Sequence, residues 1–286
     1  MTELYIIGYT LSMWNKLTQE LAVCGLNAVI ALAEYHPEQI NRLFLREERL
    51  KLFTGICKDL AQRKRPYKIC EDEELERICK STHHQGVVAM IFLPEVKPLS
   101  RDDLAEWSNE NRTGIVLHSV GNDHNLGAMA RSAAFFDVKY LVMAGVEPKA
   151  DDASSDLVGD ESSEIDEEPR LTTGSYRVAE GGMEHVTVRS VRNTVAFLRD
   201  ASRSLITIGA DTRARQRIGD LPQIIKEMKK GGRLGTALVF GNEEVGLPDN
   251  VKSHCSVLVR IPGTGLMDSL NVAQAATLFM QRIFDL

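Results

Sequence analysis

Residues 261–276 read IPGTGLMDSLNVAQAA, and this stretch decides which fold the second half of the chain predicts. The valine-rich run SVLVRI before it predicts a strand, and the apolar spacing after it predicts a helix. The loop between them lacks both the lysine of a P-loop and the third glycine of a dinucleotide fingerprint. It offers backbone N–H and C=O groups with little positive charge, which suits a ligand such as an adenine ring.

Strands alternate with helices from Gly114 to the end of the chain. The pattern predicts strands over 114–120, 139–145, 184–190, 205–210, 236–241 and 256–261, and helices over 125–136, 191–201, 221–230 and 268–284. The last helix would be capped by Asp268 or Ser269. Such alternation is typical of a mostly parallel sheet that is covered by helices on both faces.

A smaller α/β module precedes this region. The spacing predicts helices over 27–35, 50–64 and 72–80, and strands over 40–46, 66–70 and 86–93. Residues 95–112 carry many charges and predict a linker with one short helix. Residues 1–22 show no strong pattern, so they are interpreted as a leader, and the first domain is placed at 23–94.

Charge is unevenly distributed along the chain. The net charge is −6, but nine acidic residues and no basic ones lie between Asp151 and Glu168, which leaves 31 acidic and 34 basic residues elsewhere. The segment 149–170 is poor in hydrophobic residues and is interpreted as a mobile acidic insertion. The remaining body is mildly basic, with clusters such as Arg63-Lys64-Arg65, and this permits an RNA partner.

Composition argues against several classes of protein. The chain has no apolar run long enough to span a membrane, and its N-terminal residues lack the basic start of a signal peptide. Five cysteines form no CxxC pair, and seven histidines show no ligand spacing. We therefore expect a cytoplasmic protein with reduced thiols, without a membrane segment or a metal, in which His83 and His84 make local hydrogen bonds.

Two further stretches carry chemistry. Residues 125–133, NLGAMARSA, place Asn125 where it could cap a helix, give that helix a small-residue face around Gly127, and set Arg131 six residues later. Residues 240–248, FGNEEVGLP, follow a predicted buried strand. Ligands gather at the carboxyl ends of strands in open α/β sheets, so we expect a binding site there.

In this order, the patterns NxGAxxR, FGNExxGL and IPxxGxxxSLNVA resemble the three motifs of the SpoU (TrmH-like) branch of the SPOUT RNA methyltransferases. The segment SYRVAEGGMEHV between the first two also resembles the family's connecting sequence. The resemblance covers residues 113–286. The first module, with GLNAVIALAE near its start and HHQGVVA near its end, resembles the ribosomal-protein-L30e-like substrate-binding domain of such enzymes.

The resemblance implies a deep trefoil knot in the C-terminal parallel-sheet domain, S-adenosylmethionine as cofactor, a homodimer formed through the knotted domain, and methylation of a ribose 2′-hydroxyl in rRNA or tRNA. It assigns the cofactor to Gly241, Asn242, Ile261, Pro262, Gly265 and Leu270. It assigns catalysis to Arg131, Asn125, Glu243, Ser269 and Asn271. Contact with the RNA substrate is expected from Arg63, Lys64 and Arg65.

Two departures from the family pattern stand out: IPG at 261–263 where the family often has IPM, and Ala273 where it often has serine. Neither removes a residue with an assigned catalytic role. Because a guanidinium stays protonated, we expect Arg131 to hold phosphate and stabilise negative charge on the 2′-oxygen, oriented by Asn125 and Glu243.

Two alternatives stay open at this point. One is a catalytically inactive RNA-binding factor in ribosome assembly that keeps the same fold. The other is a knotted methyltransferase that acts on a base, although such branches carry different motifs.

Overall fold

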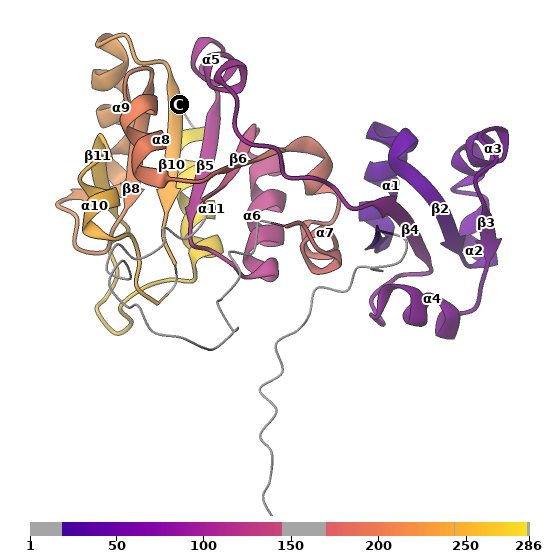
Figure 1. Cartoon of the computed structure of the whole chain (residues 1–286). Helices are drawn as coiled ribbons and strands as arrows, with labels where there is room; N and C mark the ends of the chain where they lie inside the picture. Colours follow the sequence, from indigo (N-terminus) through magenta and orange to yellow (C-terminus); the bar gives the residue numbers. More distant parts are fainter. Residues whose placement is uncertain (1–18, 145–169, 243, 285–286) are drawn as a thin grey trace, which may run out of the picture.

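The computed structural model describes residues 19–144, 170–242 and 244–284. The predicted leader up to residue 18, nearly all of the acidic insertion, and Glu243 lie outside the described residues. Figure 1 shows two α/β bodies, with the N-terminal one drawn in indigo and violet. Helices α6 and α7 lie between the large sheet and this N-terminal body.

The N-terminal domain is built on a four-stranded mixed sheet in the order β1-β4-β2-β3, in which only the β2–β3 pair is parallel. Its strands are β1 (Glu20–Cys24), β2 (Ile40–Leu45), β3 (Tyr67–Ile69) and β4 (Val87–Phe92). Its helices are α1 (Leu26–Tyr35), α2 (Glu47–Leu50), α3 (Thr54–Gln62) and α4 (Asp72–Cys79).

Strand β1 corrects the predicted start of the first domain. It begins at Glu20, inside the stretch 1–22 that the sequence marks as a leader, and all five of its residues are buried against β4. A five-residue strand that is buried on both faces shows no alternation of polar and apolar residues, so its pattern gave no signal. The predicted helix 50–64 is likewise divided, because a turn at 51–53 separates α2 from α3.

The second domain contains a seven-stranded sheet in the order β7-β6-β5-β10-β8-β11-β9, and every pairing in it is parallel. Its strands are β5 (Thr113–His118), β6 (Tyr140–Ala144), β7 (Thr187–Val191), β8 (Leu205–Ala210), β9 (Gln216–Arg217), β10 (Gly235–Phe240) and β11 (Val257–Arg260). Its longer helices are α6 (Asp123–Phe135), α7 (Thr173–Ala179), α8 (Thr194–Ala201), α9 (Leu221–Lys230) and α11 (Val272–Phe284), with a short α10 (Asp249–Lys252).

Helices cover both faces of this sheet, as its hydrophobic strands predict. Alternate residues of β5 and β10, such as Ile115 and Leu238, join α6, α9 and α11 in one core. Their neighbours Val116 and Ala237 face α8, α10 and the linker helix α5 (Arg101–Asn109) in a second core. Successive side chains of a strand point to opposite faces of the sheet, so the hydrophobic residues of β5 and β10 are buried in one core or the other.

Trp107 anchors the linker helix to the large sheet. Its ring is fully buried and stacks on Tyr140 at 4.9 Å, and its indole N–H donates to the carbonyl of Thr236 at 3.1 Å. Gly114 makes room for it, because a Cβ at Gly114 would lie 2.2 Å from the ring. The linker between the domains is therefore packed along the sheet.

The two domains share a continuous hydrophobic core. Helix α7 packs against β1, and the 3-10 turn η2 (Gly182–His185) packs against α1. Gly181 permits this approach, because it has a φ of +91° and a Cβ there would lie 2.8 Å from Ala31. Glu184 is enclosed at the same junction, where its side chain is 5% exposed and its Oε2 lies 3.7 Å from His36 Nε2.

Substitution Gly114→Ala tests the fit of the linker helix. The added methyl would force the buried Trp107 ring to move, so we expect the free energy of unfolding to fall by about 1–3 kcal/mol. Gly219→Ala is the matched control, because nothing lies within 4 Å of a Cβ at that position. Equal urea stabilities for the two variants would contradict the packing described.

Glu184 predicts a pH dependence of stability. Burial raises the pKa of Glu184 to about 7, against an opposing effect of His36, whereas the unfolded carboxyl titrates near 4.5. Between pH 4.5 and about pH 7 the folded state holds a proton that the unfolded chain has lost. The free energy of unfolding therefore decreases as pH rises through this range, by roughly 3 kcal/mol in total. We expect Glu184→Gln to remove this decrease in calorimetric unfolding between pH 5 and pH 8. The exposed Glu227→Gln should retain it, and equal pH profiles for wild type and Glu184→Gln would contradict the assignment.

Candidate active site at the carboxyl edge of the parallel sheet

The candidate site lies where strands β5, β10 and β11 end. Because the strands are parallel, the segments that follow them all emerge at one edge of the sheet. These segments are residues 119–122 before α6, the turn 241–247 after β10, and the loop 261–271 before α11. The three sequence stretches singled out above therefore come together at this edge, although 127 residues lie between the end of the first, at 133, and the start of the last, at 261.

The first stretch forms helix α6, and its cap differs from the prediction. Asn122 caps this helix, since its Oδ1 accepts from the backbone N–H groups of His124 and Asn125 at 2.9 and 3.4 Å. Asn125 itself is buried in the first turn, so the predicted capping role of Asn125 is wrong. Its Oδ1 instead accepts a hydrogen bond from Asn271 Nδ2 at 3.0 Å.

The small-residue face predicted for α6 receives helix α7. A Cβ at Gly127 would lie 2.5 Å from the carbonyl oxygen of Ser175, and one at Gly182 would lie 2.7 Å from the Cα of Arg131. The backbones of α7 and η2 therefore run directly along α6. Arg131 lies on this side of the helix, whereas Asn125 faces α11.

The second stretch is a tight turn after β10. Asn242 Nδ2 donates to the carbonyl of Ser119 at 3.1 Å, which ties this turn to the end of β5. The Asn242 carbonyl accepts from Gly246 N–H at 2.8 Å, and a Cβ at Gly241 would lie 2.3 Å from the Gly246 carbonyl. Only glycine fits at position 241, so backbone rather than side chain lines the site there.

The third stretch begins at the half-buried Ile261 and runs as an exposed loop through Pro262, Gly265, Ser269 and Leu270 to α11. Asn271 caps that helix, because its Oδ1 accepts from Ala273 N–H at 2.9 Å and from Gln274 N–H at 3.4 Å. The expectation that Asp268 or Ser269 caps it is wrong. Asn271 thus uses one side-chain atom to start α11 and the other to hold Asn125.

Arg131 is exposed, and its Nη1 lies 3.1 Å from Glu180 Oε1. Glu180 follows α7 directly, in a left-handed conformation. Among the described residues this carboxylate is the ionic partner of Arg131, and Asn125 faces another way. These contacts therefore do not show Asn125 orienting Arg131. Glu243, which was also expected to orient it, lies outside the described residues.

Large apolar side chains at this edge face solvent. Val245, Leu266 and Met267 are 83%, 87% and 80% exposed, and Leu270 is about half exposed. They come from the second and third stretches, beside exposed backbone N–H and C=O groups. Ligand sites typically combine apolar walls with a few polar groups, and this edge supplies both.

Two of the three basic residues expected to contact RNA remain available. Arg63 is used within the fold, because it donates to the carbonyls of Pro37, Glu38 and Ile40 and pairs with Asp59. Its predicted role in binding is corrected accordingly. Lys64 is exposed, and the guanidinium of Arg65 lies 5.9 Å from the centre of the exposed Phe92 ring.

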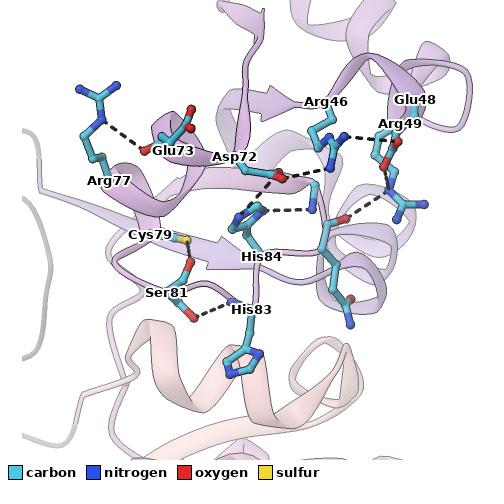
Figure 2. A network of polar contacts seen from close by, with 12 residues as sticks. Arg46, Glu48, Arg49, Asp72, Glu73, Arg77, Cys79, Ser81, His83 and His84 are labelled. Carbon is cyan, nitrogen blue, oxygen red and sulfur yellow. Dashed lines mark hydrogen bonds and ion pairs between the residues drawn. The ribbon is translucent and has the colours of Figure 1, made fainter.

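The HHQG segment, residues 83–86, makes hydrogen bonds within the N-terminal domain (Figure 2). His84 Nδ1 accepts from Gly86 N–H at 3.1 Å, and Gln85 Oε1 accepts from Leu26 N–H at 2.7 Å at the start of α1. The His83 ring points away from this network, although its backbone N–H bonds Ser81 Oγ. Local hydrogen bonding by this segment is confirmed.

No group of three or more His, Cys, Asp or Glu residues in the described part of the chain could hold a metal ion. Within the same part of the chain, no helix is long and apolar enough to cross a membrane.

Comparison with known proteins now decides the family. The sequence model of the SpoU rRNA Methylase family matches residues 112–281, which is more than half of the chain. The chain belongs to this family. A second model, described as RNA 2′-O ribose methyltransferase substrate binding, matches residues 22–97.

Curated relatives match over most of the chain. The 23S rRNA (guanosine-2′-O-)-methyltransferase RlmB of Nitrosomonas europaea is 28% identical over 94% of this chain and 92% of its own length. The uncharacterized tRNA/rRNA methyltransferase YfiF of Escherichia coli O157:H7 is 26% identical over 90% of this chain and 66% of its own length.

Solved structures share the fold. An AdoMet-bound rRNA methyltransferase from Sinorhizobium meliloti superposes with a TM-score of 0.68 at 18% identity, over 93% of this chain and 87% of that one. The SpoU methyltransferase AviRb from Streptomyces viridochromogenes gives 0.64 at 19% identity, over 94% and 91%. With the seven-stranded parallel sheet and the small N-terminal domain, these likenesses confirm the fold class predicted from the sequence.

Sequence reasoning missed three residues that shape the site: Ser119, Asn122 and Glu180. Asn122 carried a signal, since GNDHN offers a better cap position one residue before an acidic first turn. Ser119 has a φ of +55°, and its backbone carbonyl accepts the hydrogen bond from Asn242. A backbone contact of this kind leaves no pattern of side chains in the sequence. Glu180 stands before two glycines in AEGG, and glycine pairs often mark a close approach of backbones.

Two variants of Asn271 separate its capping of α11 from its bond to Asn125. Asn271→Ala removes the cap and the bond to Asn125, so we expect the free energy of unfolding to fall by about 1–2 kcal/mol. Asn271→Ser keeps a capping oxygen but cannot reach Asn125, and it should recover part of the loss. If the alanine variant matched wild type in thermal unfolding, the junction between α6 and α11 would contribute nothing, contrary to this account.

Proposed function

We propose that the chain methylates a ribose 2′-hydroxyl in rRNA or tRNA with S-adenosylmethionine as methyl donor. The observation that carries this proposal is the junction of the first and third motifs through Asn125 and Asn271 at one sheet edge. Membership of the SpoU rRNA Methylase family supports the same activity. The matched substrate-binding domain at 22–97 supports RNA as the substrate.

The residues at this edge fit the proposed cofactor. Gly241, Asn242, Ile261, Pro262, Gly265 and Leu270 would hold it. The backbone contact at Gly241 leaves no room for a Cβ, and Gly265 has a φ of +84°, so both positions present bare backbone. Apolar side chains such as Leu270 and Leu266 lie exposed beside them and can cover an adenine ring. When bound, the cofactor supplies a methyl group already activated on a sulfonium.

The protein's own contribution is positioning and charge stabilisation. Arg131 is the proposed phosphate ligand, and its guanidinium stabilises the negative charge that develops on the 2′-oxygen. Asn125 and Asn271 fix the edge between α6 and α11, and Ser269 and Glu243 complete the proposed catalytic set. Alignment of hydroxyl and methyl for in-line attack can contribute up to roughly 7–11 kcal/mol in favourable cases.

The proposed partners follow from exposed surfaces. Lys64 and Arg65 are retained as RNA contacts of the N-terminal domain, with Arg65 lying over Phe92 in a way that can stack a base. A homodimer through the second domain is proposed from Phe135 on α6 and from Leu278 and Phe284 on α11, which are all exposed. We further propose that the protein acts in the cytoplasm, where such RNA is available.

A transfer assay tests the proposed function. The purified chain, labelled S-adenosylmethionine and total rRNA and tRNA from a strain that lacks the protein should give labelled RNA. Digestion to nucleosides should then place the label on a ribose 2′-oxygen. Label on a base would favour a base methyltransferase. If no label is transferred although the RNA is bound, the assembly-factor alternative is favoured.

Substitution Arg131→Lys tests the proposed role of the guanidinium. Lysine keeps the charge but loses the planar fork that can contact a phosphate and the 2′-oxygen together, so we expect kcat to fall at least tenfold. Arg199→Lys is the control, because Arg199 is also exposed but lies on α8, at the other face of the sheet. Turnover of Arg131→Lys close to that of wild type would contradict the fork geometry.

A further inference from the structure

Glu180 touches both domains at once. One carboxylate oxygen, Oε1, lies 3.1 Å from Arg131 Nη1 on α6. The other, Oε2, accepts a hydrogen bond of 3.4 Å from Asn27 Nδ2 on α1 of the N-terminal domain. Asn27 belongs to the GLNAVIALAE stretch, whose role in the site the sequence left open.

The backbone holds Glu180 in this place. Glu180 follows the last residue of α7 with a φ of 45°, and the two glycines after it lie between the domains. A Cβ at Gly181 would lie 3.1 Å from the Asn27 carbonyl, and a Cβ at Gly182 would lie 2.7 Å from the Cα of Arg131. The turn 180–182 is therefore in van der Waals contact with the backbones that carry both side-chain partners of Glu180.

From these contacts we infer that Glu180 is a positioning residue, which couples the docking of the N-terminal domain to the orientation of the Arg131 guanidinium. This inference rests on the proposed function. Among the described residues, the ion pair joins Nη1 of Arg131 to Oε1 of Glu180. Asn27 steadies the carboxylate, which in turn steadies Arg131 for a phosphate of the RNA that the N-terminal domain has bound.

The energetics favour positioning over stability. Both partners of the ion pair are about half exposed, and such pairs contribute little to the free energy of unfolding. A small displacement of a group that acts in the transition state can nevertheless lower turnover up to a hundredfold. A Glu180 variant should therefore stay folded and lose rate.

The kinetic test uses the full chain and the variants Glu180→Gln, Asn27→Ala and their combination. We expect Glu180→Gln to lower kcat about tenfold, with KM for RNA and the calorimetric Kd for S-adenosylmethionine within twofold of wild type. Asn27→Ala should lower kcat about threefold. The double variant should be no slower than Glu180→Gln, because both act through one carboxylate.

The matched control is Glu227→Gln, which removes an exposed ion pair with Lys230 on α9, at 3.0 Å, away from the site. It should leave kcat unchanged. A kcat for Glu180→Gln within twofold of wild type, an increase in kcat, or multiplicative losses in the double variant would each overturn the inference. An increase would mean that Glu180 competes with phosphate for Arg131.

A second readout does not depend on methyl transfer. Phenylglyoxal modifies accessible guanidinium groups, and mass spectrometry can follow the rate at Arg131 against that at Arg199 in the same sample. We expect this relative rate to rise about threefold in Glu180→Gln and also in Asn27→Ala, but not in Glu227→Gln. An unchanged rate in Asn27→Ala would overturn the coupling, whereas a wild-type chain without methyl transfer would count against the proposed function alone.

Discussion

The hydrogen bond from Asn271 to Asn125 joins two residues that are 146 positions apart and closes the edge of the sheet on which the site depends. Strand β11 lies beyond β8, but helix α11 packs against α6 and β10, so the loop 261–271 must return across the edge. The Ser132–Thr277 hydroxyl contact at 2.9 Å also joins α6 to α11, and Phe279 of α11 packs edge-on against Phe240 of β10. The ligand walls are consequently complete only when the end of the chain has docked.

The N-terminal domain is attached at the same side of the structure as Arg131. Helix α6 presents Asn125 to α11 and Arg131 to the α7–η2 segment, and that segment also packs on α1 and β1. One helix therefore connects the proposed cofactor edge with the proposed RNA-binding domain. This arrangement gives a physical reason for the small residues of the NxGAxxR stretch, since Gly127 admits α7 at a distance that no side chain would permit.

Much of the fold could be predicted from the sequence, because the long helices and buried strands carry clear periodicities. The pattern located β10 and α6 within two residues, and the rule for open α/β sheets predicted a binding site after β10. That all three stretches form one site was expected only from the resemblance to the family. Contacts between distant residues were less predictable. Both Asn125 and Asp268 had suitable residue types for caps, yet the caps are Asn122 and Asn271, because residue type alone does not fix the position at which the backbone enters a helix.

Arg63 shows the same limit for a binding residue. In the sequence it belongs to a basic cluster, but in the fold its guanidinium donates hydrogen bonds to backbone carbonyls between residues 37 and 40, while Lys64 stays exposed. The sequence shows that a residue is charged, but only the fold shows whether that charge already has a partner within the protein. Glu180 is the converse case, since an acidic residue in a connecting segment becomes part of the site through its two partners.

Hydrogen–deuterium exchange with and without S-adenosylmethionine tests the central claim most directly. The claim is that three segments at the carboxyl edge of one sheet, closed by α11, form the methyl-donor site. The account predicts slower exchange in residues 241–247 and 261–275, with no change around His84 in the N-terminal domain. Protection confined to other segments, or absent at a saturating concentration of the cofactor, would contradict it.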